Sequence, residues 1–342
     1  MSDDRFFVQR FPGTVLYFAL VSVLGCGLPE KKGPPEFATS LGALEEDQND
    51  EAFDVEPAPE AGPDDQGDDG AHRFITVDYP GSIESVVKGA NSDGDVVGFY
   101  QDVGKRFHGF LLRQGSFSTI DFPGALFTRC TGINDAGAIG GFYQLGTRQH
   151  GFVLRHGNFE TIDYPGALHT NVWGMYAGGE DEDGEGTADV VGLYVKNGVH
   201  GFRHNENGYA PIDVAGGINT SAWGVGRKGA IVGQYVTGGT THGFLRSVDG
   251  VDTSFDVPGT LASVGTQVRG ITSRGVIVGW FTDAKGTHSF SRSQDGLFTT
   301  INLPGVSITQ IDGINLSGSL IVGDYFTAAA PTVKHGFMWW QE

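Results

Sequence analysis

The chain of 342 residues contains 22 basic and 41 acidic residues, so its formal net charge is −19. This charge argues against a nucleic-acid partner, because such proteins need a basic surface to displace counterions from phosphates. The 55 glycines are more than twice the usual share of about 7% and, with 24 Phe and 10 Tyr, indicate many turns between aromatic-rich strands. The two Cys lie in different contexts and do not indicate a disulfide framework.

Residues 1–25 have the features of a secretory signal peptide. Two arginines precede an apolar run of 12 residues, Thr14 to Gly25, whereas a membrane-spanning helix needs about 20. The segment Val-Leu-Gly-Cys that ends at Cys26 resembles the lipobox of bacterial lipoproteins, which implies cleavage before Cys26 and lipid attachment to it. Such a lipid would anchor the protein to a bacterial membrane or cell surface, outside the cytoplasm. Plain secretion and a cytoplasmic location are the alternatives.

Residues 26–71 are rich in Gly, Pro, Ala, Asp and Glu, and form the next segment of the chain. Between Glu45 and Asp69 there are 12 acidic residues and no basic ones. Low hydrophobicity and charge repulsion leave too little burial to offset the entropy of ordering, so we expect a disordered acidic tether. It would hold the folded part away from the membrane. Weak binding of divalent cations is the alternative role.

From Phe74 onward the chain repeats one unit six times, which indicates a repetitive architecture. The Asp of the segment F-x-T-[IV]-D-x-P-G recurs at intervals of 43, 42, 50, 43 and 46 residues, as Asp78, Asp121, Asp163, Asp213, Asp256 and finally Asn302. The His of the segment His-Gly-Phe recurs as His108, His150, His200, His242, His288 and His335. The other two recurring segments are V-G-x-aromatic, as at 97–100, and G-[IV]-N, as at 132–134.

Each recurring segment is short, rich in β-branched and aromatic residues, and bounded by Gly, Pro, Asn or Asp, which is typical of strands. Four strands in a unit of about 42–50 residues match a propeller blade, so we predict an all-β, six-bladed β-propeller over residues 72–342. The G-[IV]-N strand would be innermost, followed by V-G-x-aromatic and His-Gly-Phe, with F-x-T-[IV]-D outermost. The last unit lacks its outermost strand, so residues 74–79 should pair with residues 335–341 and close the ring.

The repeat unit resembles that of the extracellular HAF-repeat family, which carries a His-small-Phe motif together with D-x-P-G and G-I-N segments. The resemblance covers nearly all of residues 74–342, although the motif here is His-Gly-Phe. It implies an extracytoplasmic domain similar to a β-propeller, and it implies no particular activity.

The His and Asp columns are structural candidates, because a residue present in every blade is explained most simply by blade architecture. One His and one Asp per blade can bond to each other or to the backbone and so satisfy buried polar groups. Metal ligation by the six His is the alternative, but it would require them on the innermost strands. An aromatic column could bind a ligand near one mouth or could pack the rim, and it comprises Tyr100, Tyr143, Tyr194, Tyr235 and Tyr325, with Phe281.

Residues that break the repeat are the better candidates for function. The third unit has an acidic insertion in which Asp181, Asp183 and Glu185 could bind Ca²⁺, a cation that takes 6–8 oxygen ligands. A solvated acidic loop is the alternative, and Ca²⁺ is the only cofactor that the sequence suggests.

Three tryptophans and one cysteine also depart from the repeat. Trp173 and Trp223 on innermost strands, and Trp280 beside the aromatic column, could face the channel and stack on a sugar or peptide, or could pack the core. Cys130 is expected to be a buried thiol without a disulfide partner.

The chain has no G-x-S-x-G, H-E-x-x-H, P-loop or C-x-x-C motif, so no reaction is indicated, although propeller enzymes can assemble a site from loops of several blades. We therefore expect a membrane-anchored extracytoplasmic binding module that is a monomer and has an extracellular protein or glycan as its partner. The alternatives are a hydrolase or lyase that acts on a polysaccharide or lactone at the channel mouth, and a structural surface protein.

Overall fold

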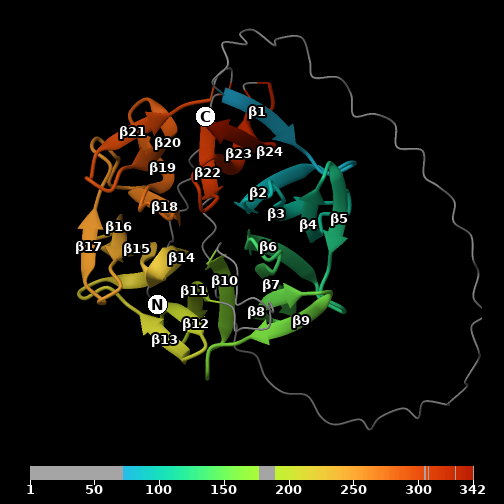
Figure 1. The fold of residues 1–342 in the computed structure, drawn as a ribbon, viewed down its shortest axis with the longest axis horizontal. Helices are drawn as coiled ribbons and strands as arrows, with labels where there is room; N and C mark the ends of the chain where they lie inside the picture. Colours follow the sequence, from blue (N-terminus) through green and yellow to red (C-terminus); the bar gives the residue numbers. More distant parts are fainter. Residues whose placement is uncertain (1–71, 177–188, 304–305, 307, 328, 342) are drawn as a thin grey trace, which may run out of the picture. The chain divides into compact units, whose positions relative to one another are not determined.

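The computed structural model describes residues 72–176, 189–303, 306, 308–327 and 329–341. In these residues 24 strands form six four-stranded antiparallel sheets, which are arranged in a ring (Figure 1). The prediction of an all-β, six-bladed β-propeller is therefore confirmed. The signal peptide, Cys26, the acidic tether and the insertion with Asp181, Asp183 and Glu185 lie outside the described residues.

The first three blades are contiguous in sequence. Blade 1 comprises β2 (Glu84–Ala90), β3 (Val96–Gln101), β4 (Phe107–Arg113) and β5 (Ser116–Ile120). Blade 2 comprises β6 (Phe127–Ile133), β7 (Ile139–Leu145), β8 (Arg148–Arg155) and β9 (Asn158–Ile162). Blade 3 comprises β10 (His169–Met175), β11 (Val190–Val195), β12 (Val199–Asn205) and β13 (Gly208–Ile212).

The last three blades include the one that closes the ring. Blade 4 comprises β14 (Ile218–Val225), β15 (Ile231–Thr237), β16 (Thr240–Arg246) and β17 (Asp252–Phe255), with the 3₁₀ turn η1 (Arg227–Gly229) between β14 and β15. Blade 5 comprises β18 (Thr266–Ile271), β19 (Ile277–Asp283), β20 (Gly286–Arg292) and β21 (Phe298–Ile301). Blade 6 comprises β22 (Ile308–Ile314), β23 (Leu320–Phe326), β24 (His335–Gln341) and β1 (His72–Val77).

The two ends of the described chain meet in blade 6. β1 pairs antiparallel with β24, from His72 opposite Gln341 to Val77 opposite Gly336. This pairing confirms the predicted closure, and the order of strands within each sheet is the predicted one. Closure gives blade 6 its fourth strand, and the radial arrangement leaves only short, protected strand edges.

Tight packing within each blade explains why glycine and phenylalanine recur together. A Cβ placed on Gly98 of β3 would lie 1.9 Å from the carbonyl oxygen of Val86, so no larger residue fits there. The ring of Phe110 from the His-Gly-Phe segment packs on the same glycine and is fully buried. Every blade repeats this arrangement, with the buried phenylalanines Phe110, Phe152, Phe202, Phe244, Phe290 and Phe337.

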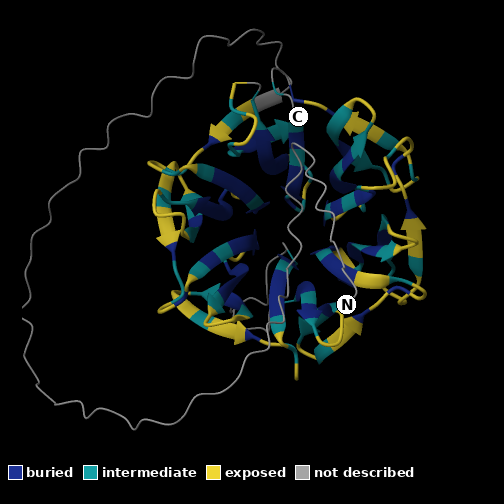
Figure 2. Cartoon of the chain, turned by 180° about the vertical axis from the view of Figure 1, so that it is seen from behind, coloured by how far each residue is buried: buried dark blue, intermediate teal, exposed yellow. Residues whose placement is uncertain are grey.

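The up-and-down course of the strands gives the ring two faces. One face carries the connections between second and third strands and the D-x-P-G connections between blades, and we call it the D-x-P-G face. The opposite face carries the turns between first and second strands and between third and fourth strands. The inner strands are mostly buried, whereas the outermost strands carry many exposed residues (Figure 2). Within the described ranges, no helix is long and apolar enough to span a membrane.

Candidate functional site

The His and Asp columns meet within each blade. In blade 1 the Nδ1 atom of His108 lies 2.8 Å from a carboxylate oxygen of Asp121, and in the closing blade His335 lies 2.7 Å from Asp78. The same contact joins the remaining pairs at 2.8–3.2 Å: His150 with Asp163, His200 with Asp213, His242 with Asp256, and His288 with Asn302. These pairs tie the third strand to the D-x-P-G connection, which is an architectural role.

The residues of the aromatic column lie on the second strands and are buried within the blades. Their rings pack beside the His column, as Tyr100 does on His108 with ring centroids 5.0 Å apart. Four of the tyrosine hydroxyl groups bond to the outermost strands; that of Tyr143, for example, lies 2.9 Å from Thr161 Oγ1. Burial raises the pKa of Tyr194 to about 12. All five tyrosines are buried, which favours the packing interpretation over contact with a ligand: Tyr100, Tyr143, Tyr194, Tyr235 and Tyr325.

Six β-bulges line the axis of the ring. In each innermost strand one residue has no partner in the register with the second strand, as between Val87 and Gly89 in blade 1. A bulge leaves the extra residue out of the ladder and redirects it, and here the six extra residues border the axial cavity. From blade 1 to blade 6 they are Lys88, Thr131, Trp173, Trp223, Arg269 and Asp312. We call this set the axial ring.

The axial ring is held together by charge and aromatic contacts. The carboxylate of Asp312 lies 2.7 Å from Lys88 Nζ and 3.4 Å from Arg269 Nε. The Arg269 guanidinium lies 4.0 Å from the centre of the Trp223 ring, which in turn lies 4.5 Å from that of Trp173. Burial opposes ionisation of Asp312, but Lys88 and Arg269 outweigh it, so the pKa of this carboxyl is lowered. Burial also lowers the pKa of Lys88 against the attraction of Asp312.

A second carboxylate extends the charged cluster into blade 6. Asp324 on β23 is fully buried and lies 3.1 Å from Lys334 Nζ. Burial raises the pKa of Asp324 to about 6; Asp312 adds to this effect and Lys334 opposes it. The charges of Asp312 and Asp324 thus face Lys88, Arg269 and Lys334 at the junction where the ring closes.

The axial cavity is small. Its volume is about 60 Å³, whereas sites for drug-sized ligands have about 300–1,000 Å³. Trp173 and Trp223 border the axis, as one of the two sequence interpretations proposed, but the space beside them suits water rather than a sugar ring. Trp280 lies on β19, and its ring is 5.4 Å from the Arg269 guanidinium. In the described part of the chain, no three His, Cys, Asp or Glu residues gather as metal ligands do.

Five exposed leucines and isoleucines lie on the D-x-P-G face. Each member lies at or shortly before the start of an innermost strand and is 41–64% exposed. The backbone holds each one in place: the Leu126 N–H donates to Gln144 O at 2.8 Å, and the Leu168 N–H donates to Val195 O at 2.7 Å. We call this set the apolar rim, and it comprises Ile83, Leu126, Leu168, Ile218 and Leu261.

Sequence reasoning singled out Trp173 and Trp223 of the axial ring, but neither its charged members nor the apolar rim. The signal for the axial ring was the residue before the glycine of the G-[IV]-N segment, which varies among the blades while the glycine is constant. The signal for the rim was the Leu or Ile two residues after the glycine that ends the D-x-P-G segment, which reads D-V-A-G in blade 4. Cys130, in contrast, is buried and without a disulfide, as expected, and burial raises the pKa of its thiol.

Comparison with known proteins finds structural similarity at low sequence identity. No family model matches the chain, and no curated protein matches it. A catalytically inactive virginiamycin B lyase from Staphylococcus aureus, with quinupristin, is 11% identical over 79% of this chain and 100% of its own, with a TM-score of 0.47. TolB from Acinetobacter baumannii is 11% identical over 77% of this chain and 65% of its own, with a TM-score of 0.49. A mutant of AofleA from Arthrobotrys oligospora is 11% identical over 76% and 85%, with a TM-score of 0.48. The assignment as a six-bladed β-propeller rests on the sheet topology of the chain itself, and no ligand or reaction is transferred to it.

Proposed function

We propose that the chain is an extracytoplasmic binding module whose D-x-P-G face binds a protein through the apolar rim. The observation that carries this proposal is the rim itself, which places an exposed Leu or Ile at the same site in five of the six blades. Isolated apolar residues are common on protein surfaces, but a recurring set on one face is typical of an interaction site. Burial of each such side chain would contribute about 1.5–3 kcal/mol before the costs of association.

A protein fits this face better than a glycan. Sugars stack on exposed aromatic rings, whereas the tyrosines of the aromatic column are buried within the blades and Trp173 and Trp223 border a narrow cavity. The rim offers aliphatic side chains, which complement the apolar core of a protein interface. Glycan binding at another surface is an outcome that the test below would reveal.

The hydrolase or lyase alternative predicts unpaired carboxylates or His side chains at the channel mouth. Asp312 and Asp324 are the axial carboxylates, and each contacts a cation at 2.7–3.1 Å. The His column is engaged with the Asp column in the same way. No observation on the described residues favours catalysis specifically. Turnover of a polysaccharide or lactone by the purified chain would contradict the binding proposal.

The test begins by replacing Leu126 with a photoreactive residue and irradiating intact cells that produce the protein, so that a bound partner is cross-linked. The control carries the same photoreactive residue at Leu297, on the opposite face. The protein cross-linked through Leu126 is then purified, and its affinity for the chain is measured. We expect the double variant Leu126→Asp, Leu168→Asp to weaken binding at least about tenfold and Leu297→Asp to leave it unchanged. Equal affinity of all three chains, or binding of a glycan that ignores the rim variant, would contradict the proposal.

We further propose that a lipid on Cys26 anchors this module, on the basis of the leader sequence. Cells fed radiolabelled palmitate should incorporate label into the wild-type chain and fractionate it with membranes. The Cys26→Ser variant should carry no label and should be released from the membrane fraction, because one or more acyl chains supply the attachment. Unlabelled wild-type chain in the soluble extracytoplasmic fraction would instead indicate plain secretion.

A further inference from the structure

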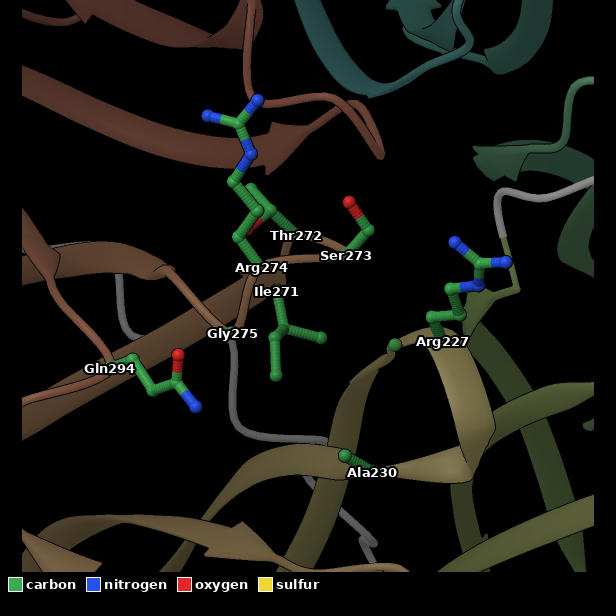
Figure 3. A pocket seen from close by; sticks show the side chains of 9 residues that line it. Arg227, Ala230, Ile271, Thr272, Ser273, Arg274, Gly275 and Gln294 are labelled. Carbon is green, nitrogen blue, oxygen red and sulfur yellow. The ribbon is translucent and has the colours of Figure 1, made fainter.

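A second surface feature lies on the face opposite the apolar rim. A pocket of about 220 Å³ opens between blades 4 and 5, bordered by the turn 226–230, the turn 271–275 and Gln294 (Figure 3). The two turns touch at its base, because a Cβ on Gly226 would lie 3.2 Å from Ile271 Cγ2. In the view of Figure 3, the polar groups of Arg227, Ser273 and Arg274 point to the same side.

The two arginines of this pocket lack the carboxylate partner that four other arginines on the same face have. Arg227 and Arg274 are exposed, and neither has an ion pair or hydrogen bond with another described residue. At the ends of the third strands of blades 1 to 4, four arginines on this face instead contact carboxylates at 2.6–3.3 Å: Arg113 with Asp95, Arg155 with Glu160, Arg203 with Asp189, and Arg246 with Asp252. Two guanidinium groups are therefore left unneutralised in one pocket of a chain with a net charge of −19.

The pocket also interrupts the symmetry of the ring. The corresponding turns of blades 1 and 2 carry Asp93 and Asp135 and are joined by a hydrogen bond from Ser92 N to Asp135 Oδ1 at 2.8 Å. Between blades 5 and 6, Ser273 N donates to Leu316 O at 2.9 Å. Between blades 4 and 5 the turns instead become basic and enclose a space.

The chemistry of the lining defines the ligand. A guanidinium group presents parallel N–H donors that match a carboxylate or phosphate, and the pocket is lined by two such groups, one from each blade. The Ser273 hydroxyl and the Gln294 amide can bond to neighbouring hydroxyl groups, while Ile271 and Ala230 supply an apolar surface. We propose that this pocket binds a small oxyanion ligand, namely a carboxylate or phosphate group on a molecule about the size of a monosaccharide.

Calorimetric titration of the full chain tests this site, because the acidic segments of the protein are then present as competitors. The probes are glucuronate, inorganic phosphate and, as a neutral control of matched size, glucose. We expect glucuronate or phosphate to bind and glucose not to bind; the tighter of the two anions identifies which group the pocket selects. The variants Arg227→Gln and Arg274→Gln should each weaken that binding at least about tenfold.

The matched control is Lys285→Gln, which removes an exposed cation from the D-x-P-G face of blade 5. It should bind the anion like the wild type, and so should Leu126→Asp, which separates this site from the rim. Unchanged affinity in the double variant Arg227→Gln, Arg274→Gln would overturn the proposal. An equal loss in Lys285→Gln, or no binding of either anion up to about 10 mM, would overturn it as well.

Discussion

Asp312 is the buried carboxylate through which charged residues of neighbouring blades contact one another at the axis. Its carboxylate is nearly inaccessible and lies between Lys88 of blade 1 and Arg269 of blade 5, so it joins three blades electrostatically. A buried ion pair repays its desolvation only when its geometry is good, and loss of one partner leaves an unpaired buried charge. The contribution of Asp312 to the fold is therefore best measured by removing it.

We expect Asp312→Asn to lower the free energy of unfolding by about 3–5 kcal/mol, because Lys88 and Arg269 would then be buried without this counter-charge. Urea unfolding followed by tryptophan fluorescence measures the change. The matched control is Asp249→Asn, at an exposed site without an ion pair among the described residues, which should shift the free energy by less than about 0.5 kcal/mol. Similar stabilities of the two variants would refute the role assigned to Asp312.

Asp324 should make stability depend on pH in a defined direction. Its pKa of about 6 in the folded state lies above its ordinary value of 3.8, so the folded state retains a proton that the unfolded state has lost. Its contribution to the free energy of unfolding is complete below about pH 4 and is lost as the pH rises through about 6, by about 3 kcal/mol in total.

The measurement compares the wild type with Asp324→Asn in urea at several pH values. The stability of the wild type relative to the variant should fall between pH 4 and pH 7, whereas the variant lacks this titration. A relative stability that stays constant, or that rises with pH, would show that burial does not dominate the ionisation of Asp324.

At the scale of the element, β1 differs from the other outermost strands, because it comes from the opposite end of the described chain and completes blade 6. Val77 of β1 is buried and packs with Val87 of the neighbouring blade, while the Thr76 hydroxyl lies 2.8 Å from that of Tyr325. The hydroxyl contact matches those that hold the outermost strands of blades 2 and 4, so β1 is bound to its sheet in the same way.

Amide hydrogen exchange tests this closure. The amides of β1 should be protected to the same degree as those of β5, the outermost strand of blade 1, since both are the last strand of a four-stranded sheet. The variant Val77→Asp, which buries a carboxylate, should lose protection in β1 and β24 before the other blades. Exchange of β1 at the rate of a free loop in the wild type, with β5 protected, would mean that the ring is not closed by this strand.

The strands could be predicted from the sequence because their signals are local. The β-branched and aromatic segments, the P-G turns and the fixed repeat length each specify a strand or its end without reference to the rest of the molecule. The position of Tyr100 could not be decided in this way, because a period of two indicates which residues share a face and not what covers that face. Its burial depends on Tyr79, from the preceding connection, whose ring stacks on it at 3.7 Å.

The axial ring illustrates a second limit. Lys88 and Arg269 border the axis because each is the extra residue of a bulge, and a bulge is a difference in register between two strands. The residue pattern of one strand therefore does not reveal where its register with the next strand shifts. The contact of Lys88 with Asp312 further depends on two units at opposite ends of the repeat becoming neighbours when the ring closes.

At the scale of the whole molecule, the two faces have different chemistry. The D-x-P-G face carries the apolar rim, and the opposite face carries the arginine pocket between blades 4 and 5. The narrow axial cavity between them is filled by the axial ring, so the two surfaces are separate sites rather than two openings of one ligand channel. A protein partner and a small anion could therefore bind at the same time.

Methyl NMR of the full chain, labelled at Leu and Ile, tests the central claim most directly, with the protein captured through Leu126 as the titrant. We expect the methyl resonances of Ile83, Leu126 and Leu168 to shift on addition of the partner, because their side chains become buried in the interface. Leu297, an exposed leucine on the opposite face, should keep its resonance position. A shift of Leu297 with the rim resonances unchanged would contradict the account.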